Sequence, residues 1–422
     1  MDGPADRREL LLLTFAIVLV ALSQRAVLAV IGPLTRDLRA GDGLSTTAVG
    51  LLAATPLLAF GLVSPIGPSF AARFGIERTV VGCMLVLAGS LFVRSLPFAL
   101  LLFAGTLVAG AAIAITNVLL PALVKRRYGT HATFMTGVYS VALGLGAALG
   151  AGLAVPSEGW FAGSWRGALA WWAAPALLGA LVWLPLLRGA SSRGPGAAHV
   201  RVNLWRDRIA WRVAGFMALL GISFYSLVAW LPEIYRHEGL SKGTAGALLS
   251  LSLLVGIPGS FLVGALAGRL RDQRTLVLAT GLPLVAGWLG VLLAPRAAPW
   301  LWVTLLGNGF GVGFTLVLAL VVLRAEDTPH AAALSGMAQS VGYTLGAVGP
   351  IAVGALHDLT GSWSAPLIVL VVLAVLLMLV GLAAGRPGYV RGRALADVMP
   401  SAPGASAPLP ASAPAPTRPG SP

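Results

Sequence analysis

Charged residues are scarce in this chain. Only 10% of its 422 residues are Asp, Glu, Lys or Arg, whereas soluble domains carry roughly 25%. Hydrophobic residues make up 57% of the sequence, and the mean hydropathy is +0.87. This composition excludes a soluble globular protein and predicts an integral membrane protein whose main surroundings are the lipid bilayer.

Cysteine is nearly absent, since Cys83 is the single example in the sequence. One thiol excludes a disulfide framework and a cysteine metal cluster, and Cys83 is expected to be a small buried packing residue. The five histidines show no metal-ligand spacing, and the glycine-rich runs lie inside apolar stretches instead of forming a phosphate loop. We therefore expect no enzyme activity, no metal and no cofactor.

Apolar runs of helix length recur twelve times, which predicts an all-α membrane protein with twelve transmembrane helices. All fifteen Asp and Glu residues lie in loops, at termini or at helix ends. The twelve runs cover residues 10–34, 46–70, 76–95, 98–124, 132–155, 167–187, 210–234, 243–268, 273–294, 299–323, 332–356 and 363–384.

Basic residues indicate the orientation in the membrane. If the N-terminus is cytoplasmic, most of the 29 Lys and Arg residues fall on that side, including the run Lys125, Arg126 and Arg127. Cytoplasmic loops of membrane proteins carry such an excess. We therefore expect a multi-pass protein of the cell (inner) membrane with both termini in the cytoplasm. The net charge of +14 then reflects topology, and no nucleic-acid partner is expected.

The chain divides into two related halves. "GLSTTAVGLL" at 43–52 corresponds to "GLSKGTAGALL" at 239–249, 196 positions later, and "SVALGLGA" at 140–147 corresponds to "SVGYTLGA" at 340–347, 200 positions later. Two six-helix repeats around a central site are typical of transporters. The predicted units are a first bundle, a cytoplasmic linker, a second bundle and a disordered Pro/Ala-rich tail, at residues 1–187, 188–209, 210–385 and 386–422.

Loops after the second helix of each half carry a recognisable pattern. "PSFAARFGIER" at 68–78 resembles the signature of the major facilitator superfamily, with Arg73, Gly75 and Arg78 retained. Ala72 stands where an aspartate is usual and Pro68 where a glycine is usual. Arg269, in "GALAGRLRDQR" at 264–274, is the second-half counterpart. The resemblance implies a gating role for Arg73, Gly75, Arg78 and Arg269.

Longer stretches resemble the cyanate/2-nitroimidazole porter family within that superfamily. They imply a major facilitator fold and a secondary transporter of a small anionic or polar solute, working by alternating access as a monomer. The stretches are "RAVLAVIGPL" at 25–34, "GLLAATPLLAFGLVSPIGPSFAARFGIER" at 50–78, "GAAIAITNVLLPALVKRRY" at 110–128, "TGVYSVALGLGAALGAGLAVP" at 136–156 and "WLPEIYRHEGLS" at 230–241.

Arg25 is the residue that most needs an explanation. It is the one ionisable residue predicted to lie deep in a span, where a guanidinium costs about 2.5–3.5 kcal/mol. No carboxylate in the sequence is predicted at that depth. A planar guanidinium binds small anions well in a low-dielectric cavity, so we predict that Arg25 binds the solute. The alternative is a structural arginine bound to backbone carbonyls and hydroxyl groups.

Five other polar residues within the spans are candidates for the same site: Asn117, Tyr139, Tyr225, Gln339 and Tyr343. Gln339 and Tyr343 follow Ser335 on one face of a helix, and Tyr225 occupies the second-half position that corresponds to Arg25. Hydrogen bonds between helices are the alternative role for these polar side chains. For Asn117, capping a carbonyl freed by Pro121 is equally consistent with the sequence.

Two other functions fit the same sequence. One is a multidrug-type efflux pump for small aromatic compounds, which the tyrosines would suit. The other is a membrane sensor or scaffold that transports nothing, although the chain carries no appended signalling domain. If a proton is coupled to transport, it travels with the solute as a weak acid or uses an outer carboxylate such as Glu233.

Overall fold

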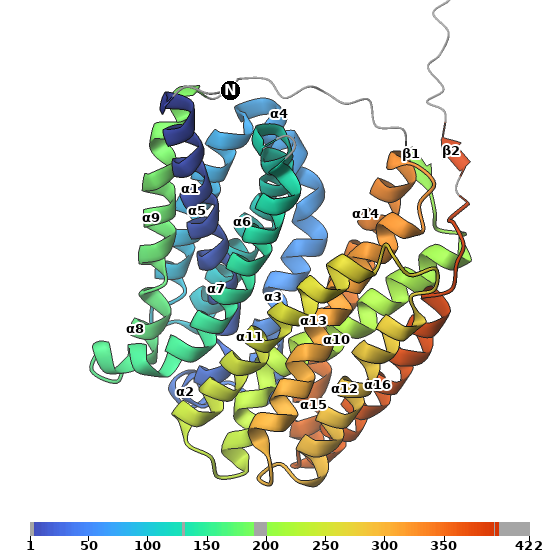
Figure 1. Cartoon of the computed structure of the whole chain (residues 1–422). Coiled ribbons are helices and arrows are strands. Elements are labelled where there is room, and N and C mark those ends of the chain that lie inside the picture. Colours follow the sequence, from blue (N-terminus) through green and yellow to red (C-terminus); the bar gives the residue numbers. More distant parts are fainter. Residues whose placement is uncertain (1–3, 129–130, 190–200, 392, 396–422) are drawn as a thin grey trace, which may run out of the picture.

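The computed structural model describes residues 4–128, 131–189, 201–391 and 393–395. Its helices form two bundles, which lie close together at one end and spread apart toward the other (Figure 1). We call the face where α1 and α10 begin the linker side, and the opposite face, which carries α2 and α8, the distal side. The first half consists of α1 (Pro4–Ala29), η1 (Gly32–Leu34), α2 (Thr35–Asp42), α3 (Thr46–Val63), η2 (Ser64–Ile66), α4 (Gly67–Phe74), α5 (Ile76–Val93), α6 (Ala99–Tyr128), α7 (Ala132–Trp160), α8 (Trp165–Ala170), α9 (Ala173–Trp183) and η4 (Leu184–Gly189).

The second half repeats the plan of the first with fewer short helices. A two-stranded antiparallel ribbon, in which Arg201 pairs with Leu395, joins the start of this half to the segment after its last helix. The elements are β1 (Arg201–Asn203), α10 (Arg208–His237), α11 (Lys242–Leu266), α12 (Arg274–Leu293), α13 (Pro299–Leu323), α14 (Thr328–Gly346), α15 (Val348–Thr360), α16 (Ser364–Ala384) and β2 (Arg393–Leu395).

The predicted all-α membrane fold is confirmed, with four differences inside the predicted spans. In the described part of the chain, eleven helices are long and apolar enough to cross a membrane. Four predicted helices are each interrupted, and a proline follows each interruption. They are the helices at 10–34, 46–70, 167–187 and 332–356, with Pro33, Pro65, Pro175 and Pro350. A proline ring clashes with the carbonyl four residues earlier, so the preceding helical turn cannot continue unchanged.

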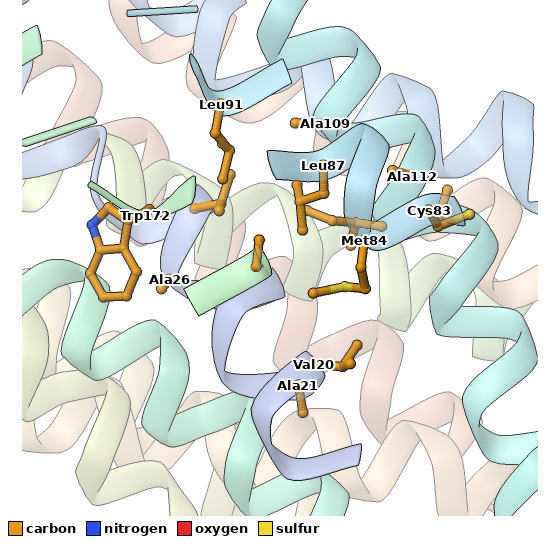
Figure 2. Close-up of a cluster of buried hydrophobic side chains, with 14 of the residues drawn as sticks. Val20, Ala21, Ala26, Cys83, Met84, Leu87, Leu91, Ala109, Ala112 and Trp172 are labelled. Carbon is orange, nitrogen blue, oxygen red and sulfur yellow. The ribbon is translucent and has the colours of Figure 1, made fainter. Parts of the chain in front are cut away.

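The core of the first half is built from small and aliphatic side chains. Figure 2 shows part of it, with Val20 of α1, Met84 of α5 and Ala112 of α6 among the labelled residues. Cys83 belongs to the same cluster, as its predicted packing role requires. Small residues allow membrane helices to approach closely, and the resulting dispersion contacts stabilise the bundle.

The tail predicted to be disordered from residue 386 begins with a packed segment. Val390 is fully buried, and its N–H donates to the Arg324 carbonyl at 2.8 Å. The N–H of Arg391 donates to the Asp207 carboxylate at 2.9 Å. This segment therefore crosses the linker-side ends of α13 and α10. The rest of the predicted tail, residues 396–422, and residues 190–200 of the predicted linker lie outside the described residues.

Candidate solute-binding site

Arg25 and three tyrosines from both halves form the centre of the site. The Arg25 guanidinium lies beside the Tyr225 hydroxyl and near the hydroxyls of Tyr343 and Tyr139. Tyr139 and Tyr225 are buried, at 6% and 8% exposure, whereas Arg25 and Tyr343 are partly exposed. Four of the six residues predicted to bind the solute are therefore brought together, and they come from α1, α7, α10 and α14.

Glycines of the internal repeat bring these helices close to one another. A side chain at Gly146 of α7 would overlap the Leu22 carbonyl of α1, at 2.3 Å. Its repeat counterpart, Gly346 of α14, lies against the ring of Tyr225, so an added Cβ would be 3.3 Å away. The motifs at 140–147 and 340–347 thus supply the surfaces on which α1 and α10 pack, and this packing places Arg25 opposite the tyrosines.

The positive charge of Arg25 has no acidic partner among the residues that the structure describes. No Asp or Glu in the described part of the chain lies within ion-pair distance of its guanidinium, whereas other arginines, such as Arg36 and Arg166, do have carboxylate partners. Glu233, the acidic residue predicted closest to membrane depth, binds Arg36 at 2.9 Å. A cation within a membrane span that has no carboxylate partner favours an anion that can occupy the site.

Asn117 joins the site through a tyrosine, whereas Gln339 makes its hydrogen bond elsewhere. The Asn117 amide oxygen accepts a hydrogen bond from the Tyr139 hydroxyl at 3.2 Å. Gln339 donates to the Ser335 hydroxyl at 2.8 Å, one turn nearer the linker side than Tyr343. The predicted polar face of Ser335, Gln339 and Tyr343 is present on α14. Its two residues nearer the linker side, Ser335 and Gln339, form a hydrogen bond with each other.

A buried glutamine next to Arg25 was missed by the sequence analysis. Gln24 is fully buried, and its amide donates to the Thr116 hydroxyl at 2.7 Å, while its amide oxygen has no partner among the described residues. This contact ties α1 to α6 directly beside Asn117. A glutamine inside an apolar run was the signal that could have identified it.

A buried arginine, Arg94, was also missed. Arg94 follows the last residue of α5, is 1% exposed and donates to the Val27 carbonyl near the end of α1 at 3.4 Å. A cation at the C-terminus of a helix binds its free carbonyls and opposes the negative end of the helix dipole. Arg94 therefore stabilises the end of the helix that carries Arg25.

The four residues predicted to form gating loops lie on the linker side. Arg73, Arg78 and Arg269 are exposed, and Arg73 lies over the ring of Phe74 at 5.3 Å. Gly75 connects α4 to α5 with a φ of 86°, which side-chain-bearing residues rarely adopt. The backbone conformation between α4 and α5 therefore explains why residue 75 is a glycine. The three exposed arginines can contact other parts of the linker side.

Two buried polar residues beside these loops, Glu77 and Gln273, were not selected by the sequence analysis. Glu77, at 1% exposure, forms an ion pair with Arg126 and lies 3.7 Å from Arg127. In the second half, Gln273 occupies the corresponding place and accepts from Arg324 at 2.5 Å. Glu77 and Gln273 are 196 positions apart, so extending the repeat by that offset would have identified both.

We expect Glu77→Ala to lower the thermal midpoint of the purified protein, because Arg126 loses a buried partner. A hydrogen bond to a charged group contributes about 1.5–3 kcal/mol. Glu9→Ala is the matched control, since Glu9 is half-exposed and pairs with Arg127 at 3.4 Å, and exposed ion pairs contribute about 0–1 kcal/mol. Equal midpoints for the two variants in a thermal unfolding experiment would contradict a buried structural ion pair.

Contacts between the two halves gather on the distal side. Arg36 of α2 binds Glu233 of α10, Lys242 of α11 binds Asp37 of α2 at 2.7 Å, and Ser250 of α11 donates to the Ala148 carbonyl of α7 at 2.9 Å. Between Tyr225 and these contacts lies a cavity of about 20 Å³, enough for about one water molecule. The distal side of the site is therefore closed to a solute.

Comparison with known proteins agrees with this geometry. Residues 13–347 match the Major Facilitator Superfamily. The chain is 38% identical to the 2-nitroimidazole transporter of Escherichia coli (strain K12) over 386 residues, 90% of this chain and 97% of that protein. It is 31% identical to the cyanate transport protein CynX of the same organism over 354 residues, 82% of this chain and 90% of that protein.

Solved structures show the same fold at low sequence identity. The D-xylose-proton symporter aligns with a TM-score of 0.71 at 13% identity, covering 90% of this chain and 98% of that chain. A point mutant of the nucleoside transporter NupG aligns with a TM-score of 0.73 at 14% identity, covering 88% and 99%. The chain therefore belongs to the major facilitator superfamily. It is a multi-pass secondary transporter that works by alternating access, and it is not an enzyme.

Proposed function

We propose that this transporter carries a small planar anion or strongly polar solute, and that the solute binds Arg25. The observation that carries the proposal is a guanidinium without a carboxylate partner, surrounded by the hydroxyls of Tyr139, Tyr225 and Tyr343. A guanidinium presents parallel N–H donors that match carboxylate-like oxygens, and each hydroxyl can donate a further hydrogen bond. Cyanate is an anion and a nitro group presents two oxygens, so the names of both E. coli relatives fit such a site.

Aromatic rings beside the site favour a planar solute. The ring of Phe224 lies 5.2 Å from that of Tyr225 and 5.3 Å from that of Phe310, and Phe60 meets Tyr343 edge to face at 5.5 Å. Flat aromatic compounds pack well against such walls. The same observation supports the second candidate function, a multidrug-type efflux pump for small aromatic compounds, in which the charge of Arg25 would contribute little to affinity.

We further propose that the linker side is cytoplasmic and that the protein acts as a monomer in the plasma membrane. The excess of Lys and Arg on the linker side supports this orientation. Among the described residues, no carboxylate pairs with Arg25 and could exchange a proton beside the solute. A coupled proton would then move with the solute as a weak acid, or through Glu233, whose partner is Arg36 on the distal side.

Matched pairs of compounds test the proposed solute class. We expect benzoate to raise the thermal midpoint of the purified protein more than benzamide does, and 2-nitroimidazole more than imidazole, because only the first of each pair presents paired oxygens to Arg25. A ligand present at 100 times its Kd stabilises by about 2.7 kcal/mol. Equal shifts within each pair, or stabilisation by lipophilic cations alone, would contradict an anion site and favour the efflux function.

A further inference from the structure

Two acidic residues reach across the interface between the halves in related positions. Glu158 lies two residues before the end of α7, and Asp358 lies two residues before the end of α15, 200 positions later. Asp358 accepts hydrogen bonds from the N–H and the hydroxyl of Thr47 of α3, both at 2.7 Å. Glu158 accepts from the Lys242 ammonium of α11 at 2.6 and 2.7 Å. Each carboxylate therefore binds the first turn of a helix in the other half.

The repeated "GLS" motifs at 43–45 and 239–241 directly precede these first turns. Ser45 and Ser241 cap their helices by accepting from the N–H three residues later, each at 3.1 Å. A cap satisfies one of the four free N–H groups at a helix start and leaves others available. Asp358 uses one of these at Thr47. At the corresponding end of α11, Lys242 supplies the donor with its side chain.

The two contacts share a geometry and differ in charge. Asp358 lies at a helix N-terminus, where the helix dipole favours negative charge, whereas Glu158 binds the ammonium of the first residue of α11. Burial alone would raise the pKa of Asp358, but the hydrogen bonds from Thr47 outweigh it and hold this pKa below its ordinary value. Lys242 is also bound by Asp37 at 2.7 Å, so this contact is a triad of one cation and two carboxylates. The contact with Thr47 therefore favours the ionised form of Asp358 in the closed arrangement.

We propose that Glu158 and Asp358 form a pseudo-twofold latch that holds the distal side closed, and that both are therefore functional residues of transport although neither lies at the Arg25 site. Opening of the distal side separates α7 from α11 and α3 from α15, and so breaks both contacts at once. The proposal depends on alternating access and not on the identity of the solute, so its test is independent of the proposed substrate class.

Distances between labelled positions test the latch. Spin labels at Pro97→Cys and Ala297→Cys report on the distal side, and labels at Ala72→Cys and Arg271→Cys report on the linker side, in a protein whose Cys83 is replaced by alanine. All four label sites are exposed. We expect Glu158→Gln and Asp358→Asn each to raise the ratio of distal-open to distal-closed molecules about tenfold, as the loss of a charge-assisted hydrogen bond would.

The linker-side labels separate a latch from a loss of structure. In a latch variant the distal distance lengthens and the linker-side distance shortens in the same molecules, whereas loosened packing would broaden the distal distance alone. Asp358→Glu should restore the wild-type distribution. Asp272→Asn is the control, because its half-exposed carboxylate pairs with Arg274 within one loop on the linker side. Wild-type distributions in both Glu158→Gln and Asp358→Asn, or broadening confined to the distal pair, would overturn the proposal.

Discussion

Arg25→Ala is expected to abolish transport of the solute while the protein still inserts and folds. Truncating one partner of a buried, hydrogen-bonded charge pair costs about 2–5 kcal/mol, which corresponds to a loss of affinity of at least about thirtyfold. Arg25→Lys keeps the charge but loses the planar set of donors, so we expect intermediate affinity. Uptake into proteoliposomes measures transport, and the benzoate-dependent thermal shift measures binding in the same preparations.

Arg94 provides a matched comparison for this experiment. It is a buried arginine whose described hydrogen bond goes to a backbone carbonyl. Arg94→Ala is expected to lower the thermal midpoint, because it removes a cap from the end of α1, and to leave the benzoate Kd near its wild-type value. If Arg25 were a structural arginine as well, Arg25→Ala would follow this pattern of lower stability with unchanged affinity, and the solute-binding role would be wrong.

The sequence predicted the membrane architecture and the members of the site better than their contacts. The repeats at 43–52 and 140–147 indicated two related halves, and a cation in an apolar run singled out Arg25. These signals are local, because hydropathy and residue spacing are read along one helix. The structure brings Tyr139, Tyr225 and Tyr343 to Arg25 as the predicted site requires, and their role in binding solute remains our proposal.

Contacts between distant helices could not be predicted in the same way. Gln339 faces Ser335 on its own helix, while Gln24, which was not selected, binds Thr116 of α6. Which partner a polar residue finds depends on helix rotation and on close approach of small residues, and neither is encoded in spacing alone. The internal repeat, which predicted the two halves, could also have been used to select residues in pairs. Its offsets of 196 and 200 positions relate Glu77 to Gln273 and Glu158 to Asp358.

Gly32→Ala is expected to prevent full closure of the distal side. Gly32 of η1 packs against the backbone of α10 in the other half, and a Cβ at this position would lie 2.3 Å from the Val228 carbonyl oxygen. A backbone atom cannot move aside as a flexible side chain can, so the two halves must separate locally. Overpacking of this kind costs about 1–3 kcal/mol, which shifts the distal-open to distal-closed ratio by about 5- to 150-fold.

Gly82→Ala is the matched control for this steric argument. Gly82 lies within α5, and a Cβ there would meet no atom within 4 Å, so alanine should raise helix stability slightly and leave the halves unchanged. The distal label pair at residues 97 and 297 should report a longer distance in Gly32→Ala alone. Because Arg25 is intact, the solute should still bind while transport slows, since each cycle must pass through the closed state.

A Gly32→Ala protein that transports at the wild-type rate with a closed distal side would show that η1 and α10 do not limit closure. Failure of both Gly32→Ala and the latch variants to move the labels would place the barrier to distal opening elsewhere in the interface.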